Sequence, residues 1–428
     1  MIRRPFFGLT KPKLKYPVIE KPEQGAVKEL PLPKRATLMI HQADVGSDDL
    51  MIKVGDTVRT GQRLRLTEDN LGCIISTVTG TVSGISEYRG YLGKTFPTVI
   101  IDAVEDDQWD EEFKKKGFEP VPENALEFQG CLPGAPDFAS LINIQPPLDT
   151  IVVNGVDTDL LVTTNQVAVQ TETEGLSAGI EALKKMAPEK RIVFIVPPNL
   201  RSQGEKTGAE VKVIDPTYPN TLPKMIMKKV LGRVAPAGKA CEAVGVGFIN
   251  AEAVVALGKA SSKGEISVSK ILTVINKEGD RINVKALIGT PLSDILEALQ
   301  IETNPGDRLV LGGPMSGQAV YTEDIPVSSD TDAIMVQDKG QIVWSSDTQC
   351  FNCGDCVRAC PADIPVNMLV RVLENGHYEE AVKDYDLLSC IECGLCSYVC
   401  SGRIPVFQFI MLGKYEFDQI SSAEGSNG

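Results

Sequence analysis

The chain has 428 residues, too many for one compact core, so several domains are expected. Apolar residues make up 43% of the sequence and charged residues 23%, as in globular proteins, and no run approaches the roughly 20 apolar residues of a membrane span. The 43 basic and 57 acidic residues give a net charge of −14, which argues against a nucleic-acid partner.

Residues 1–32 are rich in proline and lysine and are expected to form an N-terminal arm, either a solvated tail or a docking strap. In residues 33–104, apolar and polar residues alternate around glycine turns, as in Lys53-Val54-Gly55-Asp56. This pattern is similar to the barrel-sandwich fold of biotinyl and lipoyl carriers. The tip of the expected hairpin, Thr79-Gly80-Thr81, lacks the lysine that carries a swinging arm, so a carrier function is not expected.

Residues 105–245 are expected to form an α/β unit. A charged stretch, 105–128, is interpreted as a linker with a helix. Short apolar strands are then expected at 151–153, 191–196 and 211–214, and helices at 175–186 and 223–231. Strands that alternate with helices favour a largely parallel sheet.

Residues 246–340 show a different pattern, which predicts a small β-grasp-like domain. Two strands, 268–276 and 281–288, flank the turn Glu278-Gly279-Asp280. A helix is expected to follow through Leu299, with Thr290 as its N-cap and Pro291 at its first position, where the missing N–H of proline costs nothing. Residues 341–416 hold most of the cysteines, and residues 417–428 are expected to be a disordered tail.

Eight of the eleven cysteines fall in two runs with one spacing. The runs are Cys350-x2-Cys353-x2-Cys356-x3-Cys360-Pro361 and Cys390-x2-Cys393-x2-Cys396-x3-Cys400. This is the spacing of bacterial ferredoxins with two [4Fe–4S] clusters, in which the fourth cysteine of each run binds the other cluster. The prediction is therefore that Cys350, Cys353, Cys356 and Cys400 bind one cluster, and that Cys390, Cys393, Cys396 and Cys360 bind the other.

Structural zinc is the alternative, because zinc also binds four cysteines, but zinc motifs generally use two separate Cys-x2-Cys pairs. The second run departs from the ferredoxin pattern at Ser401, which replaces the usual proline, and an altered local loop is expected there. The other three cysteines, Cys73, Cys131 and Cys241, are scattered and are expected to be small buried residues.

Given this order of domains, the chain resembles the C subunit of the Rnf electron-transport complex (the RnfC family). The most specific passages are the cysteine runs, Lys53-Val54-Gly55-Asp56 with Gly61-Gln62, Tyr218-Pro219, Ile288-Gly289-Thr290-Pro291 and Gly312-Gly313-Pro314-Met315. The α/β and β-grasp units also resemble the flavin subunit of respiratory complex I. The expected fold class is thus multidomain α/β and α+β, with a barrel-sandwich module, a complex-I-like α/β unit, an SLBB-like β-grasp unit and a dicluster ferredoxin domain.

The resemblance also implies cofactor-binding residues in the α/β unit. Members of the family carry FMN and an NADH site, with a loop reading roughly Gly-Gly-Ala-x-Phe-Pro-Thr and a strand ending in Asn-Ala-Ala-Glu-Cys-Glu-Pro. The matching residues here are Gly134, Ala135, Phe138, Asn154 and Asp157. The second glycine, the Pro-Thr pair and the acidic run are altered, which argues against NADH oxidation by this chain. The sequence also contains no G-x-G-x-x-G after a strand and no phosphate loop.

The resemblance implies a subunit docked on a membrane-embedded complex, at the cytoplasmic face of the inner (plasma) membrane. Such a complex moves electrons between ferredoxin and NAD and couples this to ion transport, so other Rnf-type subunits and ferredoxin or another small redox protein are the expected partners. Two alternatives stay open. One is an iron–sulfur relay without nucleotide chemistry, and the other is a soluble relative that feeds a cytoplasmic reductase. Only the flavin-bearing subunit is expected to be reduced by NADH.

Overall fold

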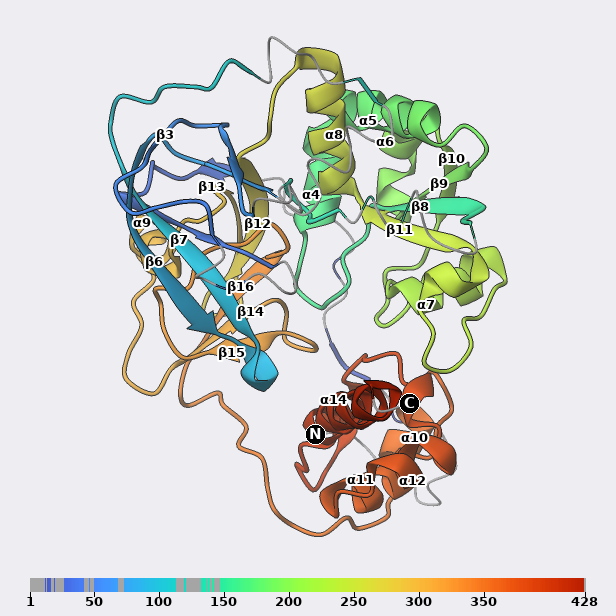
Figure 1. Cartoon of the computed structure of the whole chain (residues 1–428). Helices are drawn as coiled ribbons and strands as arrows, with labels where there is room; N and C mark the ends of the chain where they lie inside the picture. Colours follow the sequence, from blue (N-terminus) through green and yellow to red (C-terminus); the bar gives the residue numbers. More distant parts are fainter. Residues whose placement is uncertain are drawn as a thin grey trace.

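The structure is a computed structural model of the whole chain. It describes residues 12, 14–16, 19, 27–41, 46, 50–67, 73–112, 119–120, 132–136, 138, 141 and 147–426. Most of the expected linker, 105–128, and Cys131 lie outside these residues, as does the side chain of Cys73. Figure 1 shows the cysteine-rich domain, in red, as a lobe below the α/β unit and the two β-rich units.

The barrel-sandwich module is built from short antiparallel strands. Four of them form a sheet in the order β2-β7-β6-β3, and β4 pairs with β5. Their bounds are β2 Arg35–Met39, β3 Thr57–Val58, β4 Arg63–Arg65, β5 Cys73–Ile75, β6 Gly80–Arg89 and β7 Thr95–Ala103. A 3-10 turn, Tyr91–Gly93, joins the last two. Alternate apolar residues, such as Leu38, Val82 and Ile101, point into one core, as the alternating sequence predicts.

The α/β unit has a parallel sheet in the order β10-β9-β8-β11. Its strands are β8 Thr150–Asn154, β9 Arg191–Val196, β10 Glu210–Val213 and β11 Val246–Asn250. Its helices are α4 Thr164–Thr171, α5 Thr173–Met186, α6 Arg201–Glu205, α7 Pro223–Ile226 with a following π turn Met227–Leu231, and α8 Ala251–Lys263, and 3-10 turns cover Pro198–Leu200 and Cys241–Val244. Residues 151–153 of β8 and 192–196 of β9 are apolar and buried because both faces of the sheet are covered.

The expected division between residues 245 and 246 is corrected by this sheet. Strand β11 pairs with β8 from Val246 to Asn250, and α8 packs against α5, so both belong to the α/β unit. The side chain of Asn250 accepts a hydrogen bond from Ala253 N at 3.0 Å and caps α8. The sequence prediction missed this strand and helix because it did not separate them from the β-rich segment that follows.

The β-grasp unit has a sheet in the order β1-β13-β12-β16-β14-β15. The bounds are β1 Lys28–Glu29, β12 Ser269–Ile275, β13 Arg281–Leu287, α9 Leu292–Leu299, β14 Arg308–Leu311, β15 Gln318–Val320 and β16 Ala333–Gln337. The predicted N-cap is wrong: Pro291 precedes α9, and the Thr290 hydroxyl donates to Leu287 O at 2.8 Å instead. Strand β1 runs parallel to β13, so this part of the arm is a strand.

The C-terminal lobe is helical. Its helices are α10 Asp355–Ala359, α11 Val366–Glu374, α12 Tyr378–Lys383, α13 Leu395–Val399 and α14 Val406–Ser426, with a 3-10 turn at Leu387–Ser389. The expected disordered tail from residue 417 is corrected, because α14 continues to Ser426. Small polar residues carry only a modest helix penalty, and the preceding turns of α14 already supply the nucleus that they extend. No helix among the described residues combines the length and the apolar character needed to cross a membrane.

Candidate iron–sulfur and flavin sites

The two cysteine runs form the same backbone structure twice, 40 residues apart. Residues 350–366 and 390–406 each give an extended loop, a five-residue helix, a turn and the start of a longer helix. Left-handed backbone recurs at the same three places in each copy. The φ angles are 54° at Asn352 and 61° at Glu392, 73° at Gly354 and 68° at Gly394, and 56° at Asp363 and 55° at Arg403.

The altered loop expected after Cys400 is not present. Cys360 and Cys400 have nearly the same backbone angles, φ −66° and ψ 121° against φ −68° and ψ 107°. In each copy the cysteine carbonyl accepts a hydrogen bond from the residue three positions on, at 3.3 and 3.1 Å. Both turns then lead through Ile-Pro-Val into a helix, so the shared prolines, Pro365 and Pro405, make the proline that Ser401 replaces unnecessary.

The thiols of the first run lie together with Cys400. A small cavity is lined by Cys350, Cys353, Cys356 and Cys400, beside Phe351. Burial, reinforced by the neighbouring thiol of Cys353, raises the pKa of Cys356 to about 12, and Cys350 and Cys400 act in the same direction. The structure therefore places the fourth cysteine of the second run beside the first three of the first run.

The thiols of the second run lie together with Cys360. Burial is the main cause that raises the pKa of Cys393 to about 12, and Cys390 and Cys360 add to it. Burial likewise raises the pKa values of Cys390 and Cys396. Crowded thiols cannot all ionise unless positive charge replaces their protons, so both sets suit a cationic iron–sulfur group. Within the described ranges, no three His, Cys, Asp or Glu side chains were found placed to hold a single metal ion.

The two sets differ in exposure. Cys360, Cys390, Cys393 and Cys396 are all buried, whereas Cys353 is exposed. Phe351, next to Cys350, is 68% exposed. The difference arises because the second run packs against the rest of the protein and the first run faces outward.

An aromatic contact holds the second run against the α/β unit. Tyr218 is buried, and its hydroxyl donates a hydrogen bond to Cys393 O at 2.6 Å. Tyr16 packs edge-on against Tyr218, with ring centroids 6.4 Å apart, and at the same centroid distance against Tyr398 on α13. Tyr398 also donates to Lys15 O at 2.6 Å. Residues 15–16 of the arm therefore lie between the α/β unit and the cysteine-rich lobe, as a strap and not as a solvated tail.

The turn Gly312-Gly313-Pro314-Met315 forms the other side of this junction. Asp159 accepts hydrogen bonds from Met315 N at 3.0 Å and Ser316 N at 2.8 Å, which fixes the turn to the α/β unit. Met315 and Tyr218 share an apolar cluster with Cys393 and Leu395. Tyr218-Pro219 and Gly312-Gly313-Pro314-Met315 were noted only as passages typical of the RnfC family. In the structure both lie against the second cysteine run.

The described residues of the expected flavin loop, 133–136 and 138, are bonded and packed within the protein. Gly134 N donates to Ser329 O at 2.7 Å, and Gly134 O accepts from the Asn250 side chain at 3.2 Å. Ala135 N donates to Leu132 O at 3.0 Å, and Phe138 lies in the apolar core of the α/β unit. Residues 121–131, 137, 139–140 and 142–146 lie outside the described part of the chain.

The strand residues expected at the same site, Asn154 and Asp157, lie at the carboxyl end of β8. Asn154 pairs in register with Asn250 on β11, so the expected residues converge at the sheet edge where α/β proteins bind ligands. Asp157 accepts hydrogen bonds from Asn165 N at 2.8 Å and from the Gln166 amide at 3.0 Å. Burial raises the pKa of Asp157 to about 6. The backbone groups of Gly134, the side-chain oxygen of Asn154 and the carboxylate of Asp157 are thus hydrogen-bonded within the protein.

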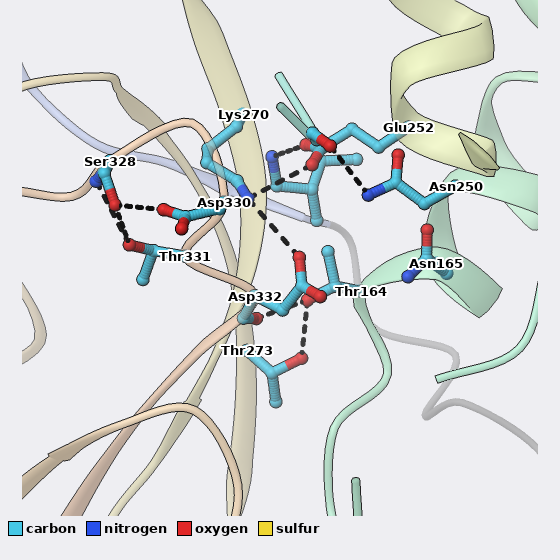
Figure 2. Close-up of polar contacts among 12 residues, drawn as sticks. Thr164, Asn165, Asn250, Glu252, Lys270, Thr273, Ser328, Asp330, Thr331 and Asp332 are labelled. Carbon is cyan, nitrogen blue, oxygen red and sulfur yellow. Dashed lines mark hydrogen bonds and ion pairs between the residues drawn. The ribbon is translucent and has the colours of Figure 1, made fainter. Parts of the chain in front are cut away.

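A buried charge cluster lies close to this edge, between the α/β and β-grasp units. Figure 2 shows Lys270 of β12 between Glu252 of α8 and Asp332. Lys270 Nζ lies 3.2 Å from Glu252 Oε2 and 3.5 Å from Asp332 Oδ1. The Lys270 side chain is 0% exposed. Burial acts to lower the pKa of Lys270, but the two carboxylates outweigh it and the pKa is raised. Burial raises the pKa of Glu252, against the pull of Lys270. Lys270 and Glu252 also line a cavity of about 440 Å³.

Comparison with known proteins identifies the two ends of the chain. Residues 14–107 match the RnfC barrel-sandwich hybrid domain, and residues 342–401 match a 4Fe-4S dicluster domain. The RnfC protein of an ion-translocating oxidoreductase complex from Pectobacterium carotovorum is 25% identical over 92% of this chain and 55% of its own length. The chain is a homologue of these RnfC proteins.

Another relative is similar in length as well. The corresponding RnfC-type protein of the proton-translocating ferredoxin:NAD(+) oxidoreductase complex of Clostridium ljungdahlii is 24% identical over 90% of this chain and 89% of its own length. This chain therefore spans about half of the Pectobacterium RnfC but most of the Clostridium one. A solved NAD+-reducing [NiFe]-hydrogenase is similar over 60% of this chain and 55% of its own, at 14% identity and a TM-score of 0.42. The RnfC resemblance and the expected fold class are confirmed.

Sequence reasoning missed three features of the RnfC-like cluster lobe. The 40-residue repeat was readable, because Ile-Pro-Val follows each run at the same distance. Tyr218 was noted only as part of a family passage, and nothing in the sequence pairs it with Cys393. Lys414, on α14, donates to Cys390 O at 2.9 Å, and a single lysine on a helix gives no sign of such a contact.

Proposed function

We propose that the chain is the electron-transfer subunit of an Rnf-type, ion-translocating oxidoreductase complex and that it relays electrons through two [4Fe–4S] clusters. The observation that carries the proposal is the pair of thiol sets, each made from three cysteines of one run and the fourth of the other. The homology to RnfC proteins supports the complex. Cys350, Cys353, Cys356 and Cys400 would bind one cluster, and Cys390, Cys393, Cys396 and Cys360 the other.

When bound, each cluster supplies a one-electron centre on four thiolates, with a potential set by its surroundings. The chain supplies those surroundings. The two five-residue helices hold the third cysteine of each run, and the turns after Cys360 and Cys400 exchange the fourth ligands. Tyr218 and the strap hold the second run against the α/β unit, so the buried set faces the interior and the exposed set faces a partner.

The partners in this proposal are the other, membrane-embedded subunits of such a complex and a ferredoxin or similar small redox protein. The chain would be held at the cytoplasmic face of the membrane through those subunits. The name of the Clostridium relative, which includes ferredoxin and NAD(+), supports this choice of partners. The proposal assigns flavin and NADH chemistry to other subunits, because hydrogen bonds within the protein already engage Gly134 N, Asn154 Oδ1 and the Asp157 carboxylate.

The test is an anaerobic preparation in which iron and flavin are quantified and NADH is added while the visible spectrum is followed. We expect about eight irons, no flavin and no bleaching by NADH, but bleaching by dithionite. Cys353→Ala should lose one cluster, about four irons, whereas Cys241→Ala, a buried cysteine of the α/β core, should lose none. Bound FMN with bleaching by NADH would reverse the assignment of flavin chemistry, and wild-type iron in Cys353→Ala would refute the ligand assignment. A purified membrane complex that lacks this chain would favour the soluble alternative.

A further inference from the structure

Two opposite charges lie beside Cys390 and pair with each other. Lys414 projects from α14, and its ammonium group donates to Cys390 O at 2.9 Å and to Glu392 Oε1 at 2.6 Å. The backbone N–H of Glu392 points at the Cys390 sulfur, 3.4 Å away. The Lys414 side chain is 15% exposed and that of Glu392 is 47% exposed. A helix-surface lysine usually keeps its ammonium group in water, so this inward contact needs a reason.

We propose that the Lys414–Glu392 pair sets the reduction potential of the cluster bound by the second cysteine run, with Lys414 as a positioning residue that raises it. The inference rests on the proposed function, because it requires that Cys390 be a cluster ligand. An electron added to a group bound by four thiolates increases its negative charge. A nearby cation stabilises that added charge, a nearby carboxylate opposes it, and burial of the thiols weakens screening by solvent.

The geometry gives the two charges unequal influence. The ammonium group of Lys414 contacts the backbone of Cys390 and is 15% exposed, whereas the Glu392 side chain is 47% exposed and is screened more by solvent. In the intact pair, the positive end therefore lies toward the cluster. Removal of Lys414 takes away that positive end and leaves the Glu392 charge uncompensated, so both effects lower the potential.

The first cysteine run has a counterpart built from different residues. Arg358 of α10 donates to Cys353 O at 3.1 Å and pairs with Asp355 at 2.5 Å. In the 40-residue repeat, Arg358 corresponds to Tyr398, and Lys414 lies outside the repeat. The cation at each run therefore comes from a separate element, so each cluster can be tuned without the other. Arg358→Gln is a matched variant for the other cluster.

The experiment is a redox titration, followed by electron paramagnetic resonance, of wild type, Lys414→Gln, Lys414→Arg, Glu392→Gln and Arg358→Gln. In Lys414→Gln, the ratio of reduced to oxidised cluster should fall about tenfold for one cluster at a fixed potential, which equals 59 mV for a one-electron couple. Lys414→Arg should restore the wild-type potential, and Glu392→Gln should raise it. Arg358→Gln should move only the other cluster.

Outcomes against the proposal are distinct from failure of the proposed function. Unchanged potentials in Lys414→Gln, with full iron, would show that the contact is only structural and would overturn the inference. So would a Glu392→Gln shift in the same direction as Lys414→Gln. If Lys414→Gln loses iron, Glu392→Gln still decides the sign, because its potential is expected to rise. Wild-type protein without iron would refute the proposed function, before any potential is measured.

Discussion

The hydroxyl group of Tyr218 donates a hydrogen bond to the backbone carbonyl oxygen of Cys393 across 2.6 Å, although 175 positions separate the two residues. This bond joins the α/β unit to the buried cysteine run. Tyr218→Phe keeps the ring but leaves the Cys393 carbonyl without this donor, which costs about 1–3 kcal/mol for a buried group. We expect faster amide hydrogen exchange in residues 390–396. Tyr91→Phe, on the exposed turn of the barrel-sandwich module, should leave that exchange unchanged, and equal exchange in both variants would count against the role of the bond.

The repeat provides a matched pair of glycines. Gly354 and Gly394 both have left-handed backbone, so alanine costs about 1 kcal/mol at each. At Gly394 the added Cβ would also lie 2.5 Å from Met315 O, whereas at Gly354 it meets the movable end of Arg358 at 2.9 Å. We expect Gly394→Ala to lower the thermal stability more than Gly354→Ala does, since a backbone atom cannot move aside. Equal decreases in the melting temperature of the two variants, measured by calorimetry, would mean that the backbone at Met315 can move to make room for the added Cβ.

The buried charge cluster predicts a large loss from one substitution. Lys270→Met removes the cation between Glu252 and Asp332 and leaves two uncompensated carboxylates. The expected loss is about 3–5 kcal/mol of unfolding free energy. The double variant Lys270→Met with Glu252→Gln should recover part of it, because one buried charge is then removed. Denaturant unfolding measures both, and a double variant less stable than the single one would show that Glu252 is not the group left unpaired.

The pKa of Asp157 predicts a pH dependence of stability. The carboxyl group has a pKa of about 6 in the folded protein, because of burial, against 3.8 as its ordinary value. The folded state thus holds the proton more tightly than the unfolded state. The contribution of Asp157 to stability is highest below pH 3.8, falls as pH rises toward about 6 and is then constant, a change of about 3 kcal/mol.

The measurement for this prediction is the difference in unfolding free energy between wild type and Asp157→Asn from pH 4 to pH 7. The asparagine side chain of the variant does not titrate. The side-chain amide oxygen of Gln166 has no hydrogen-bond partner among the described residues, so the Gln166 amide can turn and accept a hydrogen bond from the new amide group. Wild type should therefore lose stability relative to the variant as pH rises. A constant difference over this range would contradict the raised pKa.

The local patterns predicted most of the elements. Apolar runs located β8 and β9, alternation located the barrel-sandwich strands, and helical spacing located α5. The cysteine spacing also predicts the ligands of each cluster. That assignment stays a prediction, and in the structure Cys400 lies beside the first run and Cys360 beside the second. These features depend on residues close in sequence or on one repeated spacing, so a single chain is enough to reveal them.

Features that depend on distant pairing could not be predicted. The position of β11 in the parallel sheet is fixed by its pairing with β8, nearly 100 residues earlier, and its sequence is compatible with either neighbouring domain. The place of Asn154 beside Asn250 depends on the same strand pairing, and the Asp157 carboxylate accepts a hydrogen bond from Asn165 N at the start of α4. The match to a family motif therefore predicted where Asn154 and Asp157 lie. It did not predict that these side chains accept hydrogen bonds from within the protein.

The strap has a consequence for how the protein is made. Lys15 and Tyr398 touch although 383 positions separate them, so the ribosome releases Lys15 long before its partner exists. The closed junction over the second cysteine run cannot form until α13, which carries both Tyr398 and Cys396, has been synthesised. The strap must therefore wait without its partner while the α/β and β-grasp units are made. Its closure is a late step of folding, although Lys15 is made long before Tyr398.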